Sequence, residues 1–244
     1  MTTLVSQAAE IVYPSSDGEP LAETSVHVDA IIDLVVVLRQ YLEGQSAIVL
    51  ADQFLYYAQG YPKLRLAPDV MVIFDVTPGP RDNYKTWEEG QVPVVIFEIT
   101  SEGTKERDQN FKKILYEQLE VKEYWLFDPK GEWIEEQLRG YRLRGEQYEP
   151  ITDNRSEPLQ LRLAVDGQQI ALYREDTGEK LLASSELAQA LRAEILARQQ
   201  AEDRAEQERQ RAEQERQRAE QAERQVEQLK EQLRSLGVDP DNIA

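Results

Sequence analysis

The chain has no cysteine and a single histidine, His27, among its 244 residues. The absence of cysteine excludes a disulfide framework, a thiolate metal site and a cysteine nucleophile. A single histidine excludes a metal site built on histidines, and we interpret His27 as structural. No apolar run reaches the length of a membrane-spanning helix, and the N-terminus lacks the basic start and apolar core of a signal peptide. We therefore expect a soluble, cytoplasmic protein.

Basic residues are also scarce, with 28 Lys and Arg against 46 Asp and Glu and a formal net charge of −18. Such a balance does not suit a constitutive DNA-binding protein, because the phosphate backbone attracts basic surfaces. Contact with nucleic acid would require divalent cations or a local basic patch. From residue 184 onward, ten basic and 14 acidic residues give a charge of −4, which leaves −14 on the rest. A basic DNA-binding tail is thereby excluded.

Two short apolar runs rich in β-branched residues, 70–74 and 94–99, predict buried neighbouring strands of a sheet. Asp69 precedes the first run, and Glu98 lies inside the second. A buried carboxylate is unfavourable unless it is paired or binds a metal. The two acids together are therefore a candidate cation site.

Residues 102–119 follow these strands with a helical pattern. On a wheel of about 100° per residue, the expected buried face consists of Phe111, Ile114, Leu115 and Leu119. Lys112 lies at the flank of this face, with Asp108 and Tyr116 one turn to either side. Lys113 points almost opposite, into water. Lys112 is therefore the lysine that we expect to face the sheet.

These residues carry a family resemblance. The pattern is Pro68-Asp69, then Glu98-Ile99-Thr100, then Asp-x-x-x-Lys-x-x-x-Tyr over 108–116, and finally Glu-Tyr-Trp-Leu-x-Asp-Pro over 123–129. It resembles the Uma-type putative restriction endonuclease family of the PD-(D/E)XK nuclease superfamily, over roughly residues 10 to 180. The resemblance implies an α/β fold with a restriction-endonuclease-like mixed sheet flanked by helices. It also implies a metal-dependent hydrolase that cuts phosphodiester bonds in DNA, with Mg²⁺, or Mn²⁺, as the cofactor.

The resemblance further implies roles for individual residues. Asp69, Glu98 and the backbone carbonyl of Ile99 would hold Mg²⁺, because this hard cation takes oxygen ligands. The lysine that usually follows two residues after the second acid is Thr100 here. The resemblance implies that Lys112, on the following helix, takes its place. The usual Ser-Pro after the second acidic strand is Ser101-Glu102.

Three further residues are candidates for support of the site. Asp108 and Tyr116 would position Lys112, which would orient the attacking water or stabilise negative charge. Glu23 is a candidate near the metal, with a helix cap or a surface position as the alternative. The structural alternative for the whole site is a buried triad in which Asp69 and Glu98 only pair with Lys112.

A second function belongs to a different class. The chain would then be a catalytically idle adaptor or interaction protein, with a retained nuclease fold and a C-terminal docking helix. Thr100 in the lysine position, the acidic charge and the C-terminal helix favour this alternative.

The remaining pattern predicts one domain over residues 1–180. An amphipathic helix is expected from Ser25 to Leu42, with a buried face made of Val28, Ile31, Ile32, Leu34, Val35, Leu38 and Leu42. Strands are expected near 47–50, 53–58, 64–66, 133–138, 141–143, 147–151, 159–163 and 169–173. The later strands form an antiparallel extension that covers the core.

Residues 184–236 contain no proline and no glycine and are rich in Ala, Glu, Gln and Arg. Residues 205–211 are nearly repeated in 212–218, and a seven-residue period is typical of a left-handed coiled coil. The seam is alanine and glutamate in the middle and apolar only from Val226 to Leu236. We expect a coiled-coil helix over 184–236, a homodimer formed through its end, and a flexible tail over 237–244. A solvated single helix is the alternative.

Deleting residues 220–244 tests this assignment. The deletion removes the apolar end of the seam, so we expect weaker self-association and unchanged binding of divalent cations, whose candidate ligands lie within 69–116. Four buried apolar side chains contribute about 1.5–3 kcal/mol each, which the entropy of association opposes, so the dimer should be weak. Analytical ultracentrifugation of both chains measures the effect. Equal sedimentation at every concentration would contradict a tail-mediated dimer.

Overall fold

The structure is a computed structural model that describes residues 11–18 and 23–237. The chain divides into two compact units, one ending at Ser185 and the other beginning at Glu186. Of the expected flexible tail, all but Gly237 lies outside the described residues. Among the described residues, no helix combines the length and apolar character that crossing a bilayer requires.

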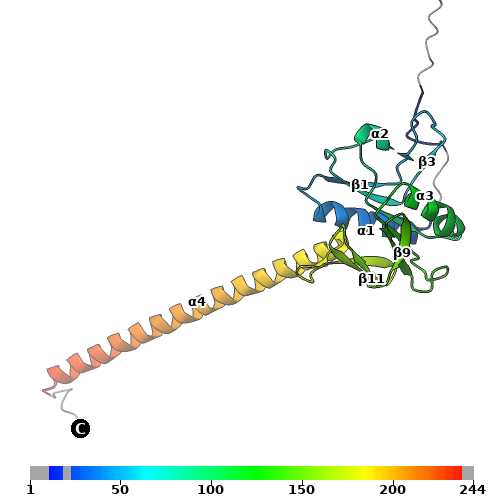
Figure 1. Ribbon diagram of the computed structural model, residues 1–244. Coiled ribbons are helices and arrows are strands. Elements are labelled where there is room, and N and C mark those ends of the chain that lie inside the picture. Colours follow the sequence, from blue (N-terminus) through cyan, green and yellow to red (C-terminus); the bar gives the residue numbers. More distant parts are fainter. Residues whose placement is uncertain (1–10, 19–22, 238–244) are drawn as a thin grey trace, which may run out of the picture. The chain divides into compact units, whose positions relative to one another are not determined.

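The first unit contains a mixed six-stranded sheet (Figure 1). Its strands, in spatial order, are β1 (Ala47–Ala51), β4 (Val70–Phe74), β6 (Val95–Ile99), β7 (Glu123–Phe127), β8 (Leu138–Arg144) and β9 (Gln147–Ile151). The pair β6 and β7 is parallel, and the other four pairs are antiparallel. The parallel pair requires a crossover connection. That connection contains the helical segments η1 (Arg107–Lys112) and α3 (Lys113–Gln118). The predicted mixed α/β fold is confirmed.

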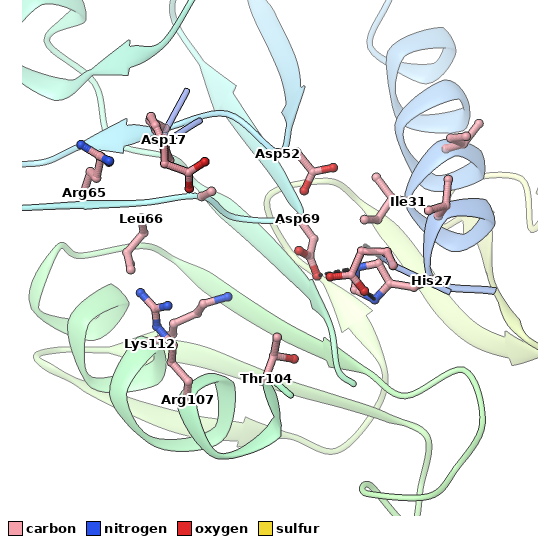
Figure 2. A pocket seen from close by; sticks show the side chains of 15 residues that line it. Asp17, His27, Ile31, Asp52, Arg65, Leu66, Asp69, Thr104, Arg107 and Lys112 are labelled. Carbon is pink, nitrogen blue, oxygen red and sulfur yellow. Dashed lines mark ion pairs between the residues drawn. The ribbon is translucent and has the colours of Figure 1, made fainter. Parts of the chain in front are cut away.

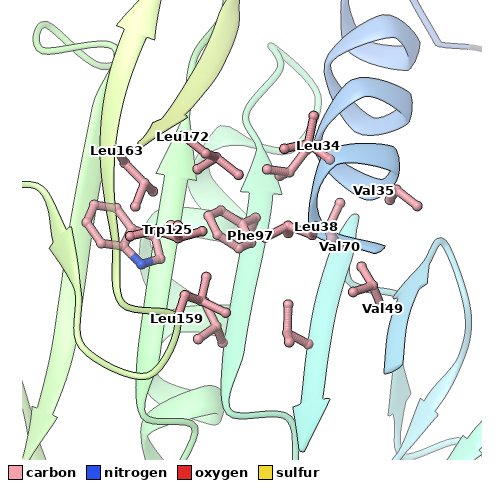
Figure 3. Close-up of a cluster of buried hydrophobic side chains, with 14 of the residues drawn as sticks. Leu34, Val35, Leu38, Val49, Val70, Phe97, Trp125, Leu159, Leu163 and Leu172 are labelled. Atoms are coloured by element: carbon pink, nitrogen blue, oxygen red, sulfur yellow. The ribbon is translucent and has the colours of Figure 1, made fainter. Parts of the chain in front are cut away.

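One face of this sheet packs against α1 (Ser25–Tyr41) and a four-stranded antiparallel sheet. That second sheet consists of β10 (Arg155–Ser156), β11 (Leu161–Asp166), β12 (Gln169–Arg174) and β13 (Lys180–Leu181). Figure 3 shows Leu34 and Leu38 of α1 directed at Phe97 of the large sheet, with Leu163 and Leu172 near Trp125. Of the expected antiparallel extension, the strands near 159–163 and 169–173 form the second layer of the core, whereas those near 141–143 and 147–151 belong to the large sheet as β8 and β9.

The other face of the large sheet packs against Tyr116 of α3 and a small three-stranded sheet. The small sheet consists of β3 (Arg65–Leu66), β2 (Leu55–Tyr56) and β5 (Tyr84–Lys85), and β5 leads into α2 (Thr86–Glu89). Aromatic rings fill much of this layer. Tyr116, Tyr124, Tyr141 and Tyr148 form a chain of ring contacts with centroids 5.1–6.5 Å apart.

The helix α1 begins where the sequence predicts, but its buried face differs in part. Thr24 caps the helix by accepting a hydrogen bond from the His27 N–H, at 3.3 Å, so Glu23 is not the N-cap. Val28 and Ile32 were expected to be buried and are 41% and 53% exposed. They lie one turn apart on the side of α1 that borders a pocket, so the sheet does not cover them.

The expected strand near 133–138 is absent, and β8 begins only at Leu138. The buried carboxylate of Asp128 is the physical reason. Its two oxygens accept hydrogen bonds from the backbone N–H groups of Lys130, Gly131, Trp133 and Ile134, at 2.5–3.1 Å. These N–H groups are then not free for a sheet ladder, and the chain turns instead.

Most of the second unit belongs to the helix α4 (Ser184–Ser235), none of whose described residues is buried. The long C-terminal helix is therefore confirmed. Its pairing with a second copy stays a prediction.

Replacing Gly140 with alanine tests the packing of the large sheet. Gly140 pairs with Trp125 across β7 and β8, and an added Cβ would lie 2.5–2.7 Å from three atoms of the buried indole. Because the buried ring has no room to move, we expect the free energy of unfolding to fall by about 1–3 kcal/mol. Urea unfolding followed by circular dichroism measures the change. Gly103→Ala is the matched control, since a Cβ there meets nothing within 4 Å, and an equal loss in both variants would contradict the prediction.

Candidate active site

The sheet register places the two predicted acids side by side. Val70 pairs with Phe97 in the antiparallel ladder of β4 and β6, so Asp69 lies opposite Glu98 one position further on. Successive side chains of a strand alternate between the two faces. Met71 and Ile96 belong to the core layer that contains Tyr116. Asp69 and Glu98 therefore share the sheet face that the crossover helix covers.

Glu98 is fully buried, and both of its carboxylate oxygens have partners on the crossover helix. The ammonium group of Lys112 lies 2.7 Å from Oε2, and the hydroxyl of Tyr116 donates to Oε1 at 2.7 Å. Lys112 also pairs with Asp108 Oδ1 at 2.8 Å. The hydroxyl of Tyr124 donates to the backbone carbonyl of Asp108 at 2.9 Å. The structure thus brings Glu98, Asp108, Lys112 and Tyr116 together, as the sequence spacing indicates.

The buried face of the crossover helix differs from the predicted one. Phe111 and Ile114 were expected to be buried and are 54% and 56% exposed. Asp108, Lys112 and Tyr116 occupy the buried face instead. The segment 107–112 is a π-helix, which winds more widely than an α-helix and so changes the phase of the helix. The polar face turns inward because the buried Glu98 carboxylate requires hydrogen-bond donors.

Thr100 stands at the end of β6, where the resembling superfamily has a lysine. Its side chain is buried, and its hydroxyl oxygen has no hydrogen-bond partner within the described part of the chain. The ammonium group beside Glu98 comes from Lys112 instead. The catalytic role that the resemblance implies for Lys112 stays a prediction.

Burial and charge act together on the ionisable groups of the site. Burial raises the pKa of Asp69 well above its usual range, and the neighbouring charge of Glu98 raises it further. Burial also raises the pKa of Glu98, although Lys112 opposes this rise. For Lys112, burial favours the neutral amine, but Glu98 and Asp108 outweigh it and hold its pKa above the usual value. The site therefore contains a charged lysine and two acids that repel one another.

Two residues that the sequence pattern did not assign to the site lie next to Asp69. Nε2 of His27 lies 3.8 Å from Asp69 Oδ2, while its Nδ1 lies 3.8 Å from Glu23 Oε2. Asp52 follows β1, where Ala51 pairs with Val70, so Asp52 lies opposite Asp69. Its backbone has a φ of 50°, and its N–H donates to the Pro68 carbonyl at 3.1 Å. The four-residue spacing of Glu23 and His27 was the one signal in the sequence, and Asp52 gave none.

A pocket of about 550 Å³ opens beside these groups (Figure 2). Its polar lining includes Glu23, His27, Asp52, Asp69 and Lys112. Figure 2 shows the His27 ring and the Asp69 carboxylate directed toward one another. Glu23 therefore borders the same pocket as Asp69, although it contacts His27 and not the other predicted site residues.

The oxygen atoms near Asp69 resemble the ligands that Mg²⁺ takes in proteins. Asp69 Oδ2 accepts the Ile99 N–H at 2.5 Å, which places the backbone of Ile99 at the site. Among residues 11–18 and 23–237, no three or more acidic or histidine side chains are arranged to hold a metal ion. Mg²⁺ is commonly held by one or two carboxylates together with water and substrate oxygens. Two neighbouring carboxylates that repel one another fit such an ion, and water and substrate oxygens would supply the remaining ligands.

Comparison with known proteins agrees with the motifs. Residues 6–173 match the Uma2 family, which is described as "Putative restriction endonuclease". The chain belongs to the Uma2 family. No curated protein matches this Uma2 chain. Among solved structures it is similar to "a putative nuclease belonging to DUF820 from Anabaena variabilis ATCC 29413", with 15% identity and a TM-score of 0.39. That match covers 56% of this chain and 72% of the other.

Replacing Asp69 with asparagine tests the electrostatics of the site. The amide keeps an oxygen that can accept the Ile99 N–H, but it cannot ionise. Folding raises the pKa of Asp69, so ionisation of this carboxyl lowers the free energy of unfolding. The decrease begins near pH 4, the usual pKa of an aspartate, and continues until the pH exceeds the raised pKa. We expect Asp69→Asn to melt at a higher temperature than the parent in EDTA. The difference should be small near pH 4 and largest at alkaline pH.

Thermal unfolding followed by circular dichroism over this pH range provides the measurement. Asp82→Asn is the matched control, because Asp82 is exposed and lies outside the pocket. A melting difference for Asp69→Asn that does not change with pH would show that the ionised carboxylate is not the cause.

Proposed function

We propose that this chain is a Mg²⁺-dependent endonuclease that hydrolyses phosphodiester bonds in DNA. The observation that carries the proposal is the pair of acids on adjacent strands, with the Lys112 ammonium 2.7 Å from Glu98. Membership of a family described as restriction endonucleases supports DNA as the substrate. The acidic charge of the chain is consistent with a need for divalent cations.

Each residue has a role that follows from its position. Asp69 and Glu98, with the carbonyl of Ile99, would hold Mg²⁺, and Mn²⁺ could replace it. Bound there, the cation supplies positive charge to the scissile phosphate and lowers the pKa of a water molecule. Lys112 would orient this water or stabilise the developing negative charge. Asp108 and Tyr116 are positioning residues, because Asp108 pairs with Lys112 and Tyr116 binds Glu98.

Cleavage of both strands of a duplex commonly requires two active sites, whereas this chain has one. We propose that a second copy supplies the other site, through the apolar end of α4. The side chains of Val226 and Leu229 are 52% and 59% exposed there, and so are free to pack against a partner.

A catalytically idle adaptor is the second candidate function. The specific observation in its favour is that both oxygens of Glu98 already have protein partners, Lys112 and Tyr116. The second acid paired with Lys112 is Asp108, where the triad alternative expected Asp69. Thr100 in place of the usual lysine points the same way. Binding of metal separates the two functions, because a triad that only stabilises the fold has no need of a divalent cation.

Titration calorimetry with Mg²⁺ and Mn²⁺ is the first test. We expect the parent chain to bind the cation and both Asp69→Asn and Glu98→Gln to lose binding, since each removes one anionic ligand while keeping the side-chain shape. Asp82→Asn is the control that should bind like the parent. The absence of binding in the parent would remove the basis of the proposal.

A plasmid-nicking assay with Mg²⁺ or Mn²⁺ tests the reaction itself. We expect cleavage by the parent and by the control variant Lys113→Gln. In the parent, the ammonium group of Lys113 lies 4.0 Å from the centre of the Tyr141 ring and not beside Glu98. The cleavage rate of Lys112→Gln should fall by about a hundredfold or more, because the substitution removes a positioned positive charge from the transition state. Circular dichroism must show that Lys112→Gln is folded, because it leaves two buried carboxylates without their cation. A parent that binds no cation and cuts nothing supports the adaptor.

A further inference from the structure

The pocket beside Asp69 has an apolar wall that the packing of the core does not explain. Val28 and Ile32 are exposed, although both are bulky and apolar, and both line the pocket. Ile31 and Leu66 line it as well but are buried. Exposed apolar side chains that border a concave site are typical of ligand contact. The wall thus offers a surface for an apolar or aromatic group next to the acids.

Two arginines line the same pocket. The Arg65 guanidinium lies 4.2 Å from the centre of the Phe54 ring, and its Nη1 donates to the Pro62 carbonyl at 3.1 Å. Arg107, on the first turn of η1, has an exposed side chain and no ion-pair partner among the described residues. Guanidinium groups bind phosphate well, because their donors match its oxygens. With Lys112, which is already paired with Glu98 and Asp108, the lining contains three cationic side chains. It also contains the carboxylates of Asp17, Glu23, Asp52 and Asp69.

The small number of basic side chains limits how many phosphates of the substrate the pocket can contact. A duplex-binding protein usually neutralises many phosphates along the backbone. Residues 1–183 carry a formal charge of −14. Among the residues that the structure describes, the basic side chains of the pocket besides His27 are Arg65, Arg107 and Lys112. Two or three phosphates correspond to one nucleotide and its neighbours. A volume of about 550 Å³ is also suited to a single nucleotide.

The depth of the site supports the same conclusion. Lys112 lines the pocket and is nearly buried, and its partner Glu98 is fully buried, so a phosphate has to enter the pocket to approach Lys112. A base that remains paired and stacked keeps its faces inside the duplex. An unpaired base can leave the stack and place its ring on an apolar wall, at the expense of a few kcal/mol or less where it is already single-stranded.

We propose that the pocket binds an unpaired nucleotide, and that the chain cuts single-stranded or locally unpaired DNA in preference to an intact duplex. The base and sugar lie against Val28 and Ile32, and the flanking phosphates contact Arg65 and Arg107. This inference rests on the proposed function for its cleavage step. The binding of an unpaired nucleotide, by contrast, is inferred from the apolar wall and the two arginines and does not depend on cleavage.

The experiment uses the full chain with Mn²⁺ and one labelled sequence in three forms: single strand, intact duplex, and duplex with an internal unpaired stretch. We expect the two forms with unpaired nucleotides to be cut at least about tenfold faster than the intact duplex, because extruding a paired base adds an energy of that order or more. A duplex cut as fast as the single strand would overturn the inference and leave the proposed endonuclease in place.

A binding assay separates the inference from the proposed function. Fluorescence anisotropy with Ca²⁺ in place of Mn²⁺ measures the affinity for single strand and duplex without a need for cleavage. We expect tighter binding of the single strand, and a weak salt dependence of about 0.7 in log–log slope per phosphate contacted. If the chain cuts nothing but shows this preference, the nucleotide pocket stands and the endonuclease does not. Equal or tighter binding of the duplex overturns the pocket.

Substitutions locate the contacts. Ile32→Gln should weaken single-strand binding by roughly tenfold, since a polar side chain loses the apolar contact with the base. Arg107→Gln should reduce the magnitude of the salt slope by about 0.7. Ile114→Gln is the matched control, because Ile114 is equally exposed and lies outside the pocket. An Ile32→Gln variant that binds like Ile114→Gln would show that the wall does not contact the base.

Discussion

The ion pair of Lys112 with Glu98 is the contact on which the rest of the site depends. Glu98 is fully buried in the middle of the large sheet, and Asp108 is buried on the helix that covers it. Two carboxylates in such surroundings would be strongly unfavourable without a cation between them. Lys112 contacts both, and Tyr116 occupies the remaining oxygen of Glu98. The pair therefore joins the crossover helix to the sheet as well as supplying a positive charge.

The same charges explain why Asp69 differs from Glu98. Glu98 has two donors from side chains, whereas Asp69 has the Ile99 N–H and a histidine at 3.8 Å. Burial disfavours the ionised form of Asp69 and the charge of Glu98 disfavours it further, so the pKa of Asp69 lies well above the usual range. A site of this kind is under-neutralised by the protein itself. A cation held there, as we propose, would link metal binding to folding through this carboxylate.

The acidic surface and the small number of basic residues at the pocket limit how a nucleic acid can approach. A protein of this charge gains little from long-range attraction to DNA. Its contacts must then come from a few groups placed close together, and the arginines beside the apolar wall are such groups. The proposed contact with a base also gives a role to Val28 and Ile32, which the packing of α1 leaves exposed.

Much of this molecule was determined by the sequence alone. Buried strands are short and rich in β-branched residues, so β4, β6 and β9 were predicted almost to the residue, and the long polar helix α4 follows from its composition and the absence of proline. The spacing of Asp108, Lys112 and Tyr116 identified the lysine that faces the sheet. Local pattern carries this information because each element repeats with a fixed period.

Tertiary structure decided which faces are buried and what lies beside Asp69. The π-turn of η1 and the demand of Glu98 for donors turned Phe111 and Ile114 outward, which a regular helical wheel does not anticipate. Asp52 and His27 reach Asp69 from the end of β1 and from α1, through strand register and helix packing, and no spacing in the sequence relates either residue to Asp69. The reason is physical: a buried charge is satisfied by groups brought from distant segments, and only the packed fold determines which ones arrive.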